Sequence, residues 1–179
     1  MFNLANTLSL ARILGVPVLI VLLSFPSRII CLLTMLLFIL IALTDMVDGF
    51  VARRYNQITN LGKFLDPLAD KILICSVLVM LVELSWIEGW IAIVIIAREI
   101  IVTGLRAIAA EQGKVIAADR FGKLKTILQT VALCPLLLHY PWFDMNPVPA
   151  GTFLLWLALI VTIFSGCNYL RNSYRILRN

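Results

Sequence analysis

Long apolar runs alternate with short polar segments along this sequence. The six runs cover residues 8–25, 29–50, 65–84, 90–110, 116–139 and 152–170. Each run is close to the roughly 20 residues that an α-helix needs to cross the hydrocarbon core of a bilayer. The segments between the runs hold proline, glycine, serine and asparagine, which are typical of turns. The pattern therefore predicts an all-α membrane bundle of six transmembrane helices, forming a single domain over residues 1–179.

Composition strengthens this prediction and excludes other classes of protein. Hydrophobic residues make up 61% of the chain and charged residues 14%, whereas soluble domains have roughly 45–50% and about 25%. An ordinary soluble enzyme is therefore excluded. Four single, widely spaced cysteines lie inside apolar runs, so we expect small buried side chains and neither a zinc site nor a disulfide framework. They are Cys31, Cys75, Cys134 and Cys167.

The positive charge lies almost entirely on one side of the predicted bundle. A six-helix arrangement places 14 of the 15 Lys and Arg residues on the side of the two termini, and Arg28 alone on the other. Because cytoplasmic ends carry the excess of Lys and Arg, both termini are expected in the cytoplasm, as in a multi-pass membrane protein. The basic residues form no single run or stripe, so nucleic acid is not an expected partner.

Aromatic residues fit the same orientation. Trp and Tyr gather at membrane interfaces, where an apolar ring meets water. The outer interface is expected to hold Trp86, Trp90 and Trp142, and the inner one Tyr55, Tyr169 and Tyr174.

Two arginines lie inside the fourth apolar run. Arg98 and Arg106 are eight residues apart, a spacing that returns to nearly the same face of a helix. A cation at this depth is costly and usually faces a partner or a wet cavity. Pairing with Glu99 or with another helix is one interpretation, and an anion site near the cytoplasmic interface is the one we favour. Lys114, Lys125 and the basic tail are assigned to charge asymmetry or to anionic lipid headgroups.

Four aspartates carry the chemistry that the sequence suggests. Asp45 and Asp48 are three residues apart near the end of the second run, and Asp66 and Asp70 are four apart at the start of the third. Each pair projects from one helix face, and a short connection lets the pairs converge. Converging carboxylates repel unless cations neutralise them. A set of oxygen ligands favours two Mg²⁺ or Mn²⁺ ions, which could serve a phosphoryl displacement.

Two alternatives accompany the metal hypothesis. The aspartates could form a salt-bridge network with Arg53, Arg54, Lys63 and Lys71. They could also form the ion site of a cation transporter. Transporter sites, however, tend to lie at the midplane between internal repeats, whereas these acids lie toward one end of their helices and no repeat is visible.

The residues between the aspartates suit a phosphate-containing ligand. Gly49 and Ala52 are small and lie near the acidic face, so a ligand could approach the backbone there. Arg53 offers a planar fork for phosphate oxygens. Gly62 gives its loop backbone freedom.

Together these residues form a signature with fixed spacing. It reads Asp45-x2-Asp48-Gly49-x2-Ala52-Arg53-x8-Gly62-x3-Asp66-x3-Asp70. It resembles the signature of the CDP-alcohol phosphotransferase family at all eight positions. The resemblance implies a six-helix fold, commonly a homodimer, with two divalent metals held by the four aspartates. It also implies that Asp70 is the general base and that Gly49, Ala52, Arg53 and Gly62 line the CDP part of the donor.

Other segments are similar to one branch of that family. Residues 3–17, 44–71, 97–106 and 122–126 resemble bacterial members that transfer a phosphatidyl group from CDP-diacylglycerol to sn-glycerol 3-phosphate and release CMP. Members of cardiolipin- or phosphatidylserine-synthase type share the donor site, so another acceptor is an alternative. The acceptor carries a phosphate, for which Arg106 is the first candidate, supported by Arg98, Arg120 and Lys123.

Overall fold

Six α-helices make up most of the described chain. The computed structural model describes residues 4–54, 60–112 and 120–178, with side chains described for residues 10–44, 68–112 and 122–174. The helices are α1 (Leu4–Leu23), α2 (Arg28–Arg54), α3 (Asn60–Glu83), α4 (Gly89–Glu111), α5 (Arg120–Leu138) and α6 (Val148–Arg178). Within these ranges the backbone forms no strand, and one isolated bridge joins Trp142 and Met145. The prediction of an all-helical chain is confirmed.

Several helices extend beyond the apolar runs that predicted them. Helix α2 continues to Arg54, α3 begins at Asn60, and α6 continues to Arg178. Hydropathy locates the apolar centre of a helix, but the backbone hydrogen bonds that define its ends do not depend on side-chain polarity. As a result, Ala52, Arg53 and Gly62 of the signature lie on helices together with the four aspartates.

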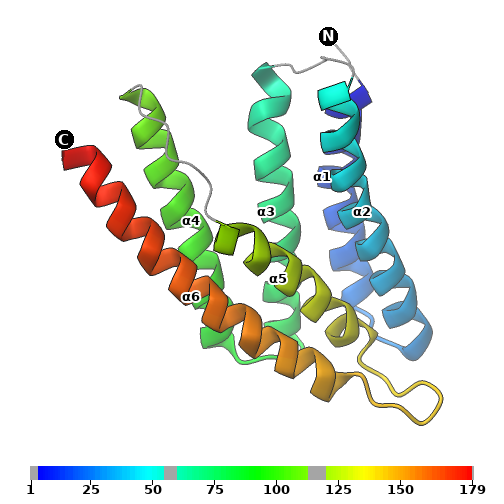
Figure 1. The fold of residues 1–179 in the computed structure, drawn as a ribbon. Helices are drawn as coiled ribbons and strands as arrows, with labels where there is room; N and C mark the ends of the chain where they lie inside the picture. Colours follow the sequence, from blue (N-terminus) through cyan, green and yellow to red (C-terminus); the bar gives the residue numbers. More distant parts are fainter. Residues whose placement is uncertain (1–3, 55–59, 113–119, 179) are drawn as a thin grey trace.

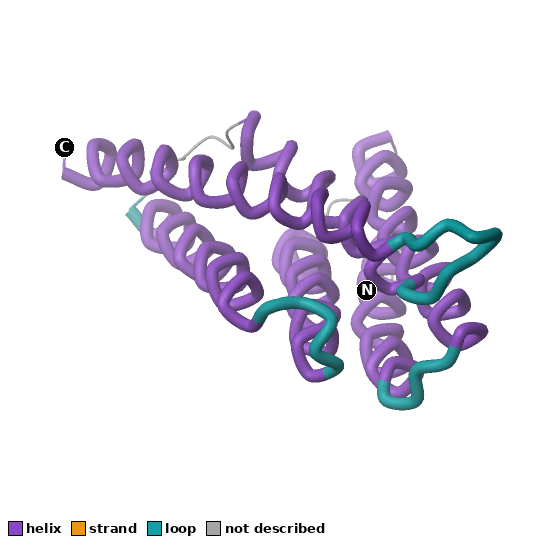
Figure 2. Tube along the Cα trace, turned by 90° about the horizontal axis from the view of Figure 1, so that it is seen from below, coloured by secondary structure: helices purple, strands orange, loops and turns teal. Residues whose placement is uncertain are grey.

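The connections between the helices divide the molecule into two ends. Residues 24–27, 84–88 and 139–147 join the helix pairs α1–α2, α3–α4 and α5–α6, and all three lie at one end, at the bottom of Figure 1 and facing the viewer in Figure 2. We call this the loop end. Helix α2 ends, α3 begins and α4 ends toward the opposite end, which we call the terminal end.

Helix packing places α1 and α6 at the centres of two groups. Helix α1 packs against α2 and α3, and α6 packs against α5 and α4. Contacts of α5 with α2 and of α4 with α3 join the two groups. Helices α2 and α3 run antiparallel, as the sequence predicted, but they make few direct contacts because α1 packs against both.

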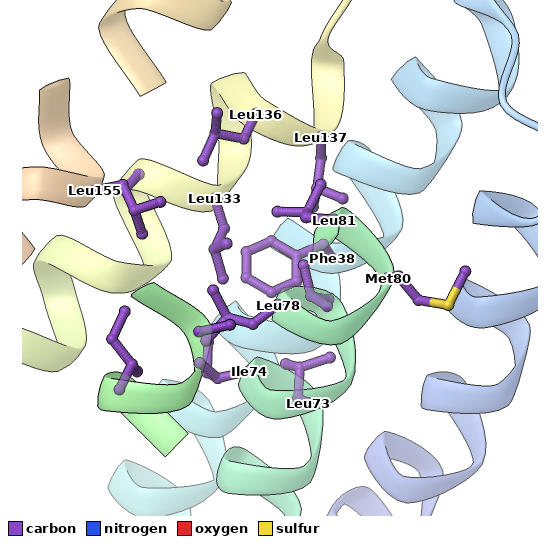
Figure 3. Packing of buried hydrophobic residues seen from close by; sticks show 14 of the residues in the cluster. Phe38, Leu73, Ile74, Leu78, Met80, Leu81, Leu133, Leu136, Leu137 and Leu155 are labelled. Atoms are coloured by element: carbon purple, nitrogen blue, oxygen red, sulfur yellow. The ribbon is translucent and has the colours of Figure 1, made fainter. Parts of the chain in front are cut away.

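The apolar core joins the two groups near the loop end. Phe38 of α2 packs with Leu78 and Leu81 of α3 and with Leu133 and Leu137 of α5 (Figure 3). All five side chains are fully buried. Close packing of this kind fixes how each helix is rotated about its axis, and it thereby determines which side chains of α3 and α5 face the interior toward the terminal end.

Large apolar side chains also cover the outside of the bundle. Exposed examples occur on all six helices and include Leu14, Ile29, Val79, Ile93 and Ile160. Patches of this extent mark contact with lipid or with another protein. In the described residues, one helix, Val148–Tyr174 of α6, is long and apolar enough to cross a membrane, and two shorter apolar stretches are Leu10–Leu23 and Arg28–Thr44. The prediction of six transmembrane helices goes beyond this finding.

Aromatic contacts organise the loop end. The rings of Trp86 and His139 stack with centroids 3.6 Å apart and planes 6° from parallel. The guanidinium of Arg28 lies 4.5 Å from the ring centroid of Trp142. Burial lowers the pKa of His139, because the protonated ring would lose its hydration.

The cysteines are free thiols, which agrees with their scattered positions in the sequence. Cys31 is buried, and Cys75 and Cys134 are half-buried. The prediction that all four are buried is wrong for Cys167, which is exposed on α6. Its apolar sequence context predicted burial, but Cys167 lines an apolar pocket between α4 and α6.

Candidate active site

The four signature aspartates lie on two helices that meet the terminal end. Helix α2 carries Asp45 and Asp48 in its second half, and α3 carries Asp66 and Asp70 in its first half. Asp70 is half-buried. The side chains of Asp45, Asp48 and Asp66 lie outside the described side chains, so their convergence stays a prediction.

An apolar pocket reaches Asp70 from the side of the bundle. Its volume is about 290 Å³, and it lies between α2, α3 and α5. Its lining includes Ala42, Ile74, Thr126 and Thr130, and Asp70 is the charged member among the described lining residues. Since α2 and α3 do not pack closely together, this space between them is available to an apolar ligand.

A buried ionic network crosses from α4 to α5 and α6. Lys125 of α5 donates to Oε1 of Glu99 on α4, and both residues are buried. Arg98 donates from Nη1 to the same oxygen at 3.2 Å and from Nη2 to Ser165 Oγ of α6 at 2.6 Å. Gly166 gives Arg98 room, because a Cβ there would lie 3.1 Å from its Cγ. One carboxylate therefore neutralises two cations from different helices.

Asp70 belongs to the same electrostatic neighbourhood. The charge of Lys125 interacts with those of Asp70, Lys71 and Arg98. The charge of Arg106 interacts with those of Lys71 and Arg98. Asp70 and Lys125 each lie thirteen residues from the loop end of their helices, about 20 Å along the axis. We call Lys71, Arg98, Arg106 and Lys125 the cationic cluster. Among the described side chains, two carboxylates, those of Asp70 and Glu99, lie with this cluster. An exposed guanidinium such as that of Arg106 attracts anions.

Arg106 is held differently from Arg98. Its Nε donates to Tyr169 Oη of α6 at 3.2 Å, and its guanidinium carbon lies 5.4 Å from the centroid of the Tyr169 ring. Arg106 itself is exposed. In the described part of the chain no carboxylate forms a salt bridge with it.

The remaining predicted residues are placed by their backbones. Gly49, Ala52 and Arg53 lie on α2. The prediction that Gly62 lies in a loop is wrong, because α3 begins at Asn60 and includes it. The side-chain surroundings of these residues lie outside the described part. The side chain of Arg120, the first residue of α5, lies outside it as well. Lys123 is exposed on α5. These assignments stay predictions.

The chemistry of the donor set suits divalent cations. Four carboxylates without a histidine or thiol form a hard oxygen set that matches Mg²⁺ or Mn²⁺. Among the described side chains no group of three acidic, His or Cys residues could hold a metal ion, and three of the four aspartates are not among them. The residues present fit the predicted ions in chemical type.

Two interior residues were misassigned from the sequence. Lys125 was assigned to charge asymmetry or lipid headgroups, but it is buried against Glu99. Tyr169 was expected at the membrane interface, but it is 3% exposed and binds Arg106. For Arg98, the pairing interpretation is the one the structure shows, and anion binding by it stays a prediction.

Helical register could have identified both residues. On α5, Lys125 shares a face with the buried Gln129 and Leu133, at steps of four residues. On α6, Tyr169 follows the buried Thr162 and Ser165 at steps of three and four. A polar residue in register with buried positions faces the bundle interior.

Comparison with known proteins agrees with the signature. A family model described as CDP-alcohol phosphatidyltransferase matches residues 2–164. The chain is 40% identical to the CDP-diacylglycerol–glycerol-3-phosphate 3-phosphatidyltransferase of Bacillus subtilis (strain 168), over 99% of this chain and 98% of that protein. Proteins with the same name are 40% identical in Salmonella choleraesuis (strain SC-B67), over 94% and 93%, and 37% identical in Rickettsia bellii (strain RML369-C), over 94% and 94%. The chain belongs to the CDP-alcohol phosphatidyltransferase family.

Proposed function

We propose that this protein transfers a phosphatidyl group from CDP-diacylglycerol to sn-glycerol 3-phosphate. Asp70 accepts the proton of the acceptor's primary hydroxyl as its oxygen bonds to the lipid-side phosphorus. The bond from that phosphorus to the CMP oxygen breaks, and CMP leaves with the electron pair. The products are phosphatidylglycerol phosphate and CMP, and no covalent enzyme intermediate is required. His139 lies at the loop end, far along the bundle from Asp70, which disfavours a phosphohistidine.

The position of Asp70 is the observation that carries this proposal. Asp70 lines an apolar pocket of about 290 Å³ and also interacts with Lys125 of the cationic cluster. A lipid donor needs an apolar path for its acyl chains, and an acceptor with a phosphate needs positive charge. Asp70 lies where these two environments meet, as a base that acts between such substrates must.

The four aspartates are proposed to hold two divalent cations, Mg²⁺ or Mn²⁺. Bound ions of this kind neutralise charge on a diphosphate and on its leaving group. Asp45, Asp48 and Asp66 serve as ligands, and Asp70 serves both as ligand and as base. Removal of divalent ions with a chelator should abolish turnover, and Mg²⁺ or Mn²⁺ should restore it. Full activity in the chelator would contradict this role.

The two substrates are assigned to different residues. Gly49, Ala52, Arg53 and Gly62 line the site for the CDP part of the donor. The acceptor phosphate binds Arg106. The supporting cations for that phosphate are Arg98, Arg120 and Lys123.

The proposal places the protein in the bacterial inner membrane. Six spans with both termini in the cytoplasm put the terminal end, and so the active site, on the cytoplasmic side. The exposed apolar side chains on the helices support contact with lipid. A single catalytic unit covers residues 1–179, and two copies form a homodimer.

A direct assay tests the proposed reaction. Purified protein is given CDP-diacylglycerol and Mg²⁺ or Mn²⁺, with glycerol 3-phosphate, serine, inositol phosphate and phosphatidylglycerol as acceptors in parallel. CMP release is expected with glycerol 3-phosphate. Release with serine or phosphatidylglycerol alone would replace the acceptor, and ion flux into proteoliposomes without any CMP release would favour a transporter.

Asp70→Asn tests the proposed base. Loss of general-base catalysis typically lowers the rate by about 10²–10⁴-fold, so kcat should fall at least ~100-fold while the thermal unfolding midpoint stays close to that of the parent. Asp144→Asn is the matched control, because Asp144 is an exposed acid at the loop end. Undiminished turnover in Asp70→Asn would remove Asp70 from the mechanism.

A further inference from the structure

Helix α6 supplies the hydrogen-bond partners of both arginines on α4. Ser165 accepts from Arg98, and Tyr169 accepts from Arg106. The acceptors are four residues apart on α6 and the donors eight apart on α4, so each pair lies on one face of its helix. The side of α6 that faces α4 is therefore a polar surface that orients two guanidinium groups.

The two arginines differ in which guanidinium nitrogens remain available to a ligand. Both Nη atoms of Arg98 are used within the protein, by Glu99 and Ser165, and its side chain is 11% exposed. Arg106 is exposed, and its hydrogen bond to Tyr169 uses Nε. A guanidinium held through Nε still has its two Nη groups, which form a planar fork that matches two oxygens of a phosphate.

The contacts of Tyr169 restrain the orientation of the Arg106 guanidinium. Its side chain is buried, so its ring has little freedom, and Arg106 lies over the ring at 5.4 Å as well as donating to its hydroxyl. A long arginine side chain on an exposed surface otherwise samples many rotamers, and ordering it on binding costs free energy. A rigid phenol removes part of that cost before the ligand arrives.

We propose that Tyr169 is a positioning residue for the acceptor: it fixes Nε of Arg106 so that the two Nη groups face a phosphate monoester. This inference rests on the proposed function, in which Arg106 binds the phosphate of glycerol 3-phosphate. It adds a residue that touches neither substrate and acts through the arginine.

Tyr169→Phe is the sharpest variant, because it keeps the ring and removes the hydroxyl. Loss of a hydrogen bond of this type corresponds to a change of about 5- to 10-fold in an equilibrium constant. We expect the KM for glycerol 3-phosphate to rise about 5- to 10-fold, while the KM for CDP-diacylglycerol and kcat each change less than about 2-fold. Tyr174→Phe is the matched control, since Tyr174 is an exposed tyrosine on the same helix, and it should leave all three constants unchanged.

A double-mutant cycle separates positioning from a general structural role. In the Arg106→Ala background, Tyr169→Phe should have no further effect on the KM for glycerol 3-phosphate. An equal added effect in that background, or equal rises in both KM values, would overturn the role of Tyr169. So would an unchanged KM in Tyr169→Phe when Arg106→Ala raises it.

If the proposed function itself is wrong, the same measurements give a different outcome. If Arg106→Ala leaves the KM for glycerol 3-phosphate unchanged, Arg106 does not bind the acceptor, and the role of Tyr169 fails with it. If purified protein releases no CMP with glycerol 3-phosphate, the reaction itself has been misassigned. Thermal unfolding of each variant identifies a loss of fold, and Tyr169→Phe is expected to stay within about 3 °C of the parent.

Discussion

The two halves of α6 make contacts of different kinds. Toward the loop end, α6 packs closely on α5: a Cβ on Gly151 would lie 2.8 Å from Cγ of Leu136, and Thr162 accepts a hydrogen bond from Gln129 at 3.1 Å. Toward the terminal end, α6 uses Ser165 and Tyr169 to bind arginines of α4. One helix thus has a close-packed half and a half that holds charges.

The difference separates stability from function within a single element. Close packing depends on shape, so changes in side-chain volume are costly in the first half, and the contacts described there involve no charged group. The charged half depends on partners: each buried cation is tolerated only while its acceptor is present. Variants in the first half should therefore alter the free energy of unfolding, and variants in the second half should alter both that free energy and substrate affinity.

The largest effect on stability is expected from Glu99→Leu. This change leaves Lys125 buried without its carboxylate, and breaking a buried ion pair from one side costs about 3–5 kcal/mol. Denaturant unfolding in detergent micelles measures the loss. Adding Lys125→Met should recover part of it, because this change removes one of the two cations that Glu99 neutralises, while Arg98 keeps its hydrogen bond to Ser165.

The close-packed half supplies the control for this prediction. Gln129→Leu combined with Thr162→Val removes a buried neutral pair that joins α5 and α6, and it should cost about 1 kcal/mol or less. If Glu99→Leu is no more destabilising than this control, the ionic network does not distinguish the two halves.

The sequence predicted the helices of this bundle but not how they face one another. Apolar runs locate helices because length and hydropathy are local properties. The spacing of Asp66 and Asp70 likewise required only one helix to be known. The contact of Lys125 with Glu99 depends on the rotation of α4 and α5 about their axes, which is set by core side chains such as Phe38 and Leu133. Register alone could place Lys125 inside the bundle but could not name its partner.

A smaller effect is expected from Gly151→Ala in the close-packed half. The added methyl would approach Leu136 at three atoms, including its backbone nitrogen at 3.1 Å. Overpacking of this kind costs about 1–3 kcal/mol. The unfolding free energy should fall while the KM for glycerol 3-phosphate stays unchanged. A normal stability would mean that α5 and α6 separate without cost at this position.

Gly104→Ala tests the same substitution where there is space. Gly104 lies on α4, and a Cβ there would meet no atom within 4 Å. Replacing a helical glycine with alanine stabilises by roughly 0.5–1 kcal/mol. Thermal unfolding should therefore show a small rise, opposite in sign to the effect at Gly151. Destabilisation at both positions would indicate that the glycine effect does not depend on packing.

The smallest effect concerns charge at the loop end, where the half-buried ring of His139 stacks on Trp86. Burial against Trp86 lowers the pKa of His139, so between that lowered pKa and about 6.5 the unfolded chain binds more protons than the folded one. Stability should therefore be fully present above about pH 6.5 and decline as the pH falls through the lowered pKa. His139→Asn removes the titration and keeps a residue that tolerates the backbone φ of 50°. Thermal unfolding from pH 5 to 8 should show a smaller slope in the variant than in the parent; equal slopes would mean that the acid sensitivity arises in the charged half instead.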